Sequence, residues 1–151
     1  MTMRFLPCLL LAVLTGCMTT TRYSFDVSVK NDALRPITIG FTKTGPPAEP
    51  RWASPESYTN LPPDRQPPTW GHVIPPGKIA SIHIEGEFQR SVYPILRIYI
   101  GEHTLTELLA MSRGNGDRLD LNLRPGPDNA FIVTEDAGRL SAKLARLTPT
   151  Q

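Results

Sequence analysis

Cysteine is almost absent from this 151-residue chain, and both cysteines, Cys8 and Cys17, lie near its start. No cysteine follows position 17, so the remainder of the chain cannot form a disulfide and gains no such stability from an oxidising compartment. A copper site of the blue type is excluded there as well, because it requires a cysteine thiolate.

An excess of charge of either sign is missing too. The chain has 16 Lys and Arg against 14 Asp and Glu, which gives a net charge of +2 without a basic cluster. Nucleic acid is therefore not an expected partner. The longest apolar run, residues 5–14, has ten residues. That is about half of the roughly 20 residues that a membrane-spanning helix needs, so we expect no permanent span.

The sequence motifs of common catalytic sites are lacking. Neither a Gly-x-Ser-x-Gly elbow nor a Ser-x-x-Lys motif occurs, and the carboxylates are scattered along the chain. Residues 113–117 contain a Gly-x-Gly but not the third glycine or the strand-to-helix setting of a phosphate cradle, so they predict a loop. We expect no enzyme, no catalytic residue and no cofactor.

The three histidines do not form a metal-binding motif. His72, His83 and His103 lack the i, i+2 or i, i+4 spacing that brings two ligands together. His83 and Glu85 share one face of a predicted strand, which leaves a two-ligand surface site open beside the simpler hypothesis of a solvated face. We expect no metal.

Proline, by contrast, is abundant, with 16 in the chain, and at that density it disfavours a helical bundle. Instead, short segments alternate apolar and polar residues, and turn residues separate them, which is typical of β-strands. The expected strands are residues 23–30, 37–41, 70–74, 78–85, 93–100, 119–123, 130–134 and 140–147. The first two should form a hairpin around a turn at 31–33, and 93–100 should be a central strand buried on both faces.

Two segments fit more than one structure. Thr104 and Glu107 fit a capping box, and the leucines after them have helical spacing, so we prefer a short helix that ends at 114–116. Residues 140–147 fit a strand or a helix, and we prefer the strand because a tight turn precedes it. Together these elements predict an all-β fold, an antiparallel β-sandwich of seven or eight strands over residues 23–151.

The segment from residue 45 to 69 is rich in proline and has no periodicity. The aromatic residues Trp52 and Tyr58 within it, and Trp70 directly after it, argue against disorder, so we expect a long ordered loop over the sandwich. The three rings are candidates for stacking on a glycan or another small ligand, with Arg51 and Arg65 adding charge. The alternative is that the indoles plug the ends of the sandwich.

Residues 1–17 have the order of an export signal: Arg4, then the apolar run, then the small residues Thr15 and Gly16. Leu14-Thr15-Gly16-Cys17 resembles the lipobox of bacterial lipoproteins. The resemblance implies that a signal peptidase removes residues 1–16 and that Cys17 carries a diacylglyceryl thioether and an acyl group. Two or more chains anchor a protein stably, whereas one does not.

The lipobox has three further implications. The mature chain would hold 135 residues, which suits one domain. Residues 18–22 would be a tether of roughly 20 Å at full extension, which keeps the domain close to the membrane. Met18 stands where an aspartate retains lipoproteins in the inner membrane, so the resemblance implies the outer membrane, with the domain facing the periplasm.

The strand pattern also resembles the immunoglobulin-like modules of envelope lipoproteins, without the paired cysteines of antibody domains. We therefore expect a membrane-anchored envelope lipoprotein that acts as a non-catalytic structural or protein-interaction module. Its partners would be the lipid bilayer, through the acylated Cys17, and another envelope protein. The alternative is a module that binds a glycan or small ligand through the loop from Trp52 to Trp70.

Overall fold

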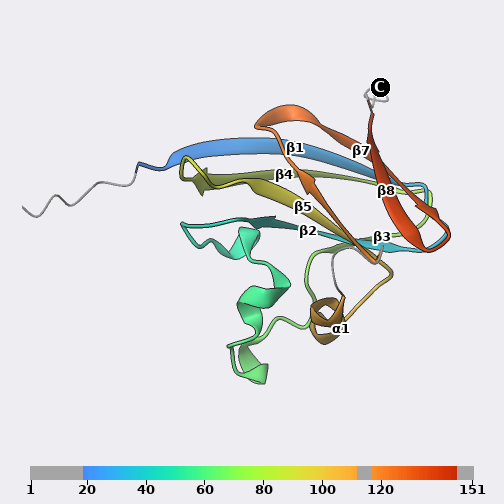
Figure 1. Ribbon diagram of the computed structural model, residues 1–151, viewed down its shortest axis with the longest axis horizontal. Coiled ribbons are helices and arrows are strands. Elements are labelled where there is room, and N and C mark those ends of the chain that lie inside the picture. Colours follow the sequence, from blue (N-terminus) through green and yellow to red (C-terminus); the bar gives the residue numbers. More distant parts are fainter. Residues whose placement is uncertain (1–18, 112–116, 146–151) are drawn as a thin grey trace, which may run out of the picture.

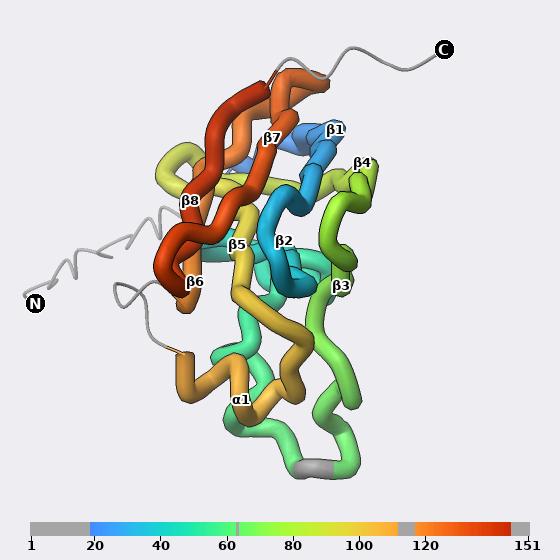
Figure 2. Tube along the Cα trace, turned by 90° about the vertical axis from the view of Figure 1, so that its right-hand side faces the viewer, coloured from blue at the N-terminus to red at the C-terminus, as the bar shows by residue number. Residues whose placement is uncertain are grey.

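The computed structural model describes residues 19–111 and 117–145, and these form a β-sandwich of eight strands in two sheets (Figure 1). The first sheet has the order β4-β1-β7-β8, and the second has the order β3-β2-β5-β6 (Figure 2). The strands are β1 Thr21–Asn31, β2 Ile37–Lys43, β3 His72–Ile74, β4 Ile79–Phe88, β5 Pro94–Ile100, β6 Arg118–Asn122, β7 Gly126–Asp136 and β8 Arg139–Leu144. The predicted all-β sandwich is confirmed. The strand that we preferred for 140–147 is confirmed over residues 140–144, and residues 146 and 147 lie outside the described residues.

The alternating pattern of β1 explains the core. Phe25, Val27 and Val29 are at most 1% exposed and point between the sheets, whereas Ser24 and Asp26 are exposed. The second sheet contributes Ile39, Leu96 and Ile98 to the same apolar cluster, each fully buried. Burial of these side chains on both inner faces holds the two sheets together.

The hairpin predicted for the first two strands is wrong, because β1 and β2 lie in different sheets. The buried Asn31 directs the crossing: its side-chain amide donates to the carbonyls of Arg35 and Ile74, and its side-chain oxygen accepts from the amide of Ala33. Alternation in a sequence shows which side chains face the core, but it does not show which strand lies alongside.

One strand pair departs from the expected antiparallel arrangement. β1 pairs with β7 in parallel, with a register shift between Phe25 and Val27, whereas the other five strand pairs are antiparallel. β1 therefore lies in the interior of its sheet, between β4 and β7, and only its first residues project beyond the apolar core.

A third layer covers the outer face of the second sheet. It consists of helix α1, Leu105–Ala110, and the proline-rich segment, which lie together beneath β5 and β2 in Figure 1. Leu105 and Leu108 of the helix pack with Tyr99 of β5. The predicted burial of β5 on both faces is confirmed, since Leu96 and Ile98 face the core and Tyr99 faces this layer.

The predicted short helix is confirmed together with its cap. The Thr104 hydroxyl accepts from the amide of Glu107, and the Glu107 carboxylate accepts from the amide of Thr104, which is the reciprocal capping box. The helix ends at Ala110. The predicted end at 114–116 is therefore wrong, because Met111 already has an extended backbone. The loop predicted for 113–117, apart from residue 117, lies outside the described residues.

Candidate functional site

The proline-rich segment between β2 and β3 is an ordered chain of short turns. It contains three 3₁₀ helices, η1 Pro50–Trp52, η2 Pro55–Tyr58 and η3 Pro63–Arg65. Each begins with a proline, whose fixed φ suits the first helical position and whose missing N–H removes a donor that would have no partner there. The segment thus has local structure although neither strand nor helix periodicity is present.

Trp52 closes the open side of the sandwich. Its side chain is 2% exposed and meets Phe25, Phe41 and Phe88 edge to face, with ring centroids 5.1 to 5.9 Å apart. The indole Nε1 donates to the carbonyl of Glu85 on the edge strand β4, at 2.9 Å. Gly86 makes room for the ring, because a Cβ there would lie 2.3 Å from Nε1.

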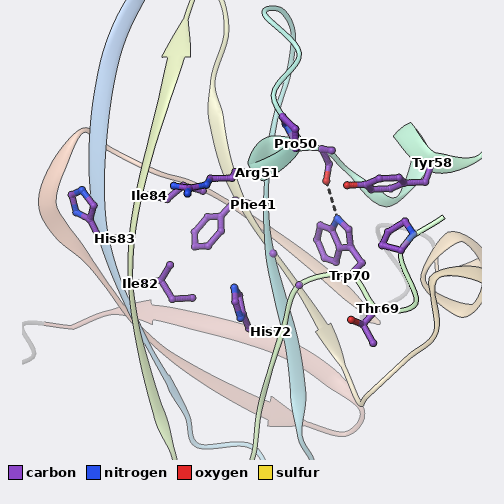
Figure 3. A pocket seen from close by; sticks show the side chains of 14 residues that line it. Phe41, Pro50, Arg51, Tyr58, Thr69, Trp70, His72, Ile82, His83 and Ile84 are labelled. Carbon is purple, nitrogen blue, oxygen red and sulfur yellow. Dashed lines mark hydrogen bonds between the residues drawn. The ribbon is translucent and has the colours of Figure 1, made fainter. Parts of the chain in front are cut away.

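Trp70 packs on the opposite face of the second sheet, beside β2. Its indole lies over Gly40, where a Cβ would come within 2.3 Å of the ring, and it meets Tyr99 edge to face at 5.8 Å. Its Nε1 donates to the carbonyl of Ala53 at 2.8 Å (Figure 3). β2 and β5 pair regularly at Gly40, and the missing side chain of this glycine admits the indole.

The three aromatic residues singled out in the sequence therefore do not form one surface. Trp52 is in the core, and Trp70 and the half-buried Tyr58 are in the outer layer. Trp70 is 6% exposed. Both indoles are covered by protein and so pack within the fold, as in the alternative to ligand binding given above. Trp70, however, lies on a face of the sandwich and not at an end.

A cavity of about 470 Å³ lies beside the segment, between β4 and the edge formed by β2 and β3 (Figure 3). Phe41, Ile82 and Ile84 line it with apolar atoms, while Arg51, His72 and His83 line it with basic groups. The arrangement offers hydrogen bonds and positive charge beside an apolar wall, and Arg51, one of the two predicted charged contacts, is part of it.

His83 is engaged by two carboxylates. Its Nδ1 lies 2.6 Å from Asp26 and its Nε2 lies 3.6 Å from Glu85. The bond to Asp26 raises the pKa of His83, which favours the protonated ring. On the strand face that His83 and Glu85 share, the imidazole thus contacts the carboxylates of Glu85 and Asp26. Within residues 19–111 and 117–145, no three His, Cys, Asp or Glu side chains are placed to hold a metal ion.

The sequence analysis missed the ion-pair network that fixes the segment to the second sheet. Arg97 of β5 donates through Nη1 to Glu56 of η2, at 2.9 Å, and through Nε to Asp120 of β6, at 3.1 Å. Burial opposes ionisation of Asp120, but the bonds from Arg118 and Arg97 outweigh it and lower its pKa. Arg97 is the one charged residue inside an apolar strand, and this could have indicated the network, since a buried guanidinium needs partners.

The predicted lipidation site, Cys17, lies outside the described residues. The structure does show that β1 begins at Thr21, two residues before the predicted start, so three residues separate Cys17 from the first strand. The tether predicted over residues 18–22 would therefore be limited to residues 18–20. In the part of the chain that the structure describes, no helix is long and apolar enough to cross a membrane.

Comparisons with protein-family models, with curated proteins and with solved structures find no match to this chain.

Proposed function

We propose that this chain is a bacterial envelope lipoprotein, held in the outer membrane by an acylated Cys17, whose sandwich is a non-catalytic structural or protein-interaction module in the periplasm. The observation that carries the proposal is the position of the lipobox. Only residues 18–20 separate the four-residue motif, residues 14–17, from the first strand of the folded body. Met18 favours the outer membrane.

The pairing of the buried charges supports a non-catalytic role. Arg97 and Asp120 bond each other, and Lys43, with a side chain 3% exposed, bonds Glu49. Each of these buried groups thus has a fixed partner of opposite charge, and breaking the pair would leave an uncompensated buried charge.

The sheet edges support a protein partner. Val73 on β3, Ile79 on β4 and Leu144 on β8 are 42%, 56% and 71% exposed, and all three strands are edge strands. Apolar side chains on a sheet edge favour pairing with an extended segment of another protein. The burial of both indoles weighs against the glycan alternative, because they are the rings that would stack on a sugar.

Metabolic labelling with a fatty acid tests the proposal. We expect the wild-type protein to incorporate the label and Cys17→Ser to lose it. Cys8→Ser is the matched control, since Cys8 would leave with the signal peptide, and this variant should keep the label. Label that depends on Cys8, or label that survives in Cys17→Ser, would contradict a lipid anchor at position 17.

A further inference from the structure

The end of the sandwich at which β1 begins carries a cleft of about 470 Å³. The first residues of β1, the β4–β5 connection and the β6–β7 connection surround it, and the first two lie together at the left of Figure 1. Its floor is apolar, formed by the buried side chains of Phe25, Phe88, Val92 and Leu123. We call this surface the tethered end.

The rim of the tethered end carries two exposed tyrosines. Tyr23 is 39% exposed and Tyr93 is 60% exposed, and both line the cleft. The other two tyrosines of the chain, Tyr58 and Tyr99, are half-buried and buried. A tyrosine with an apolar ring and a wet hydroxyl is enriched where lipid headgroups meet the hydrocarbon of a membrane.

Two arginines lie at this end, together with the carboxylate of Glu87, which accepts a hydrogen bond from the Thr20 hydroxyl. Arg90 is the one ionisable residue besides the tyrosines that lines the cleft, and Arg124 is exposed between the lining residues Leu123 and Pro125. Neither arginine makes an ion pair with another described residue, whereas Arg22 nearby is paired with Glu85 at 3.2 Å. Unpaired guanidinium groups bind phosphate strongly, through paired hydrogen bonds.

Covalent geometry brings this end close to the proposed anchor. Thr19 lines the cleft, and Cys17 is two residues before it, so their Cα atoms are at most about 7 Å apart. A thioether at Cys17 with its acyl chains in the bilayer therefore holds the cleft within reach of the headgroup layer.

We propose that the tethered end lies in the phospholipid headgroup layer of the anchoring membrane, with Tyr23 and Tyr93 inserted beside the acyl chains and Arg90 and Arg124 on lipid phosphates. The inference rests on the proposed lipid anchor and adds to it a fixed orientation. The strands then point away from the membrane, and the opposite end of the sandwich, with the turn that follows β1, faces the periplasm.

A fluorophore on an added cysteine tests the orientation, using the mature lipidated protein in phospholipid vesicles that carry a headgroup quencher. Ser91→Cys labels the exposed β4–β5 connection at the tethered end. Leu34→Cys is the control, because Leu34 is 92% exposed and follows the far end of β1. We expect quenching to be several-fold stronger at position 91 than at position 34. Equal quenching at both positions would overturn the orientation.

A second variant tests the tyrosines. Tyr93→Glu in the Ser91→Cys background should reduce the quenching toward the value at position 34, while the midpoint of urea unfolding stays unchanged because the ring is exposed. Undiminished quenching would overturn the role of the rim. Failure of the anchor itself gives a different result: the parent protein without an added cysteine would then react with the fluorophore at a free Cys17.

Discussion

At the scale of single residues, two glycines are explained by the indoles that they face. A Cβ on Gly40 would meet the ring of Trp70, and a Cβ on Gly86 would meet the ring of Trp52, each at 2.3 Å. Neither glycine is at a turn or has a positive φ, so space and not backbone freedom requires glycine there.

We predict that Gly40→Ala lowers the free energy of unfolding by about 1 to 3 kcal/mol, the usual cost of an overpacked site. Urea unfolding measures the change. In a Trp70→Leu background the shorter side chain leaves room for the added methyl, so the same substitution should cost much less. An equal cost in both backgrounds would mean that the indole is not the cause.

Arg97 faces two carboxylates of very different exposure. The side chain of Asp120 is 6% exposed and that of Glu56 is 50% exposed. Asp120→Ala leaves a buried guanidinium without its buried partner and should cost about 3 kcal/mol or more. Glu56→Ala removes a partner that water can replace and should cost no more than about 1 kcal/mol. Urea unfolding of the two variants at neutral pH makes the comparison, and equal costs would contradict this account of the network.

The contribution of Asp120 and Glu56 to the free energy of unfolding is expected to depend on pH. The pKa values of Asp120 and Glu56 are lowered in the folded protein from 3.8 and 4.5, in each case because bonds to neighbouring groups outweigh burial. Both carboxylates therefore stabilise the fold above these values, and the stabilisation is lost as the pH falls through the lower folded-state pKa values. Asp120→Asn should flatten the loss of stability on acidification.

At the scale of elements, the strands and the short helix could be predicted because their signals are local. Alternation of apolar and polar residues in β1 and β4 indicates that one face of each strand is buried. Thr104 and Glu107 provide hydrogen bonds at the start of α1 without residues from elsewhere in the chain. Strand partners could not be predicted, because the crossing at Asn31 depends on Ile74 and Lys78, far along the chain.

The proline-rich segment could be recognised as ordered, but its role could not be predicted. An aromatic residue in a loop has the same sequence signature whether it binds a ligand or fills a core. Trp52 fills the core because Phe25, Phe41 and Phe88, from three different strands, leave a space of its shape. That space exists only in the folded chain.

We predict that both tryptophans are shielded in the native protein, since their side chains are 2% and 6% exposed. Acrylamide should quench their fluorescence weakly in buffer and strongly in concentrated urea. Strong quenching of the native protein, at a protein concentration and pH where circular dichroism shows the fold intact, would mean that the segment opens and that the indoles can meet a ligand.

At the scale of the whole molecule, the proposed anchor at Cys17 would fasten one end of the sandwich to a bilayer. Eight strands in two sheets form the body, and three residues join it to Cys17. With the proposed anchor, so short a connection would leave the body little freedom to move away from the membrane, unlike a domain on a long flexible stalk. In the proposed orientation, the edges of both sheets would face sideways, toward other proteins of the envelope.

The lipid anchor is best tested by mass spectrometry of the mature protein, extracted from its native membrane. We predict a chain that begins at Cys17 and carries a diacylglyceryl thioether and an amide-linked acyl group. A mature chain that begins elsewhere, or one with an unmodified thiol at Cys17, would contradict it.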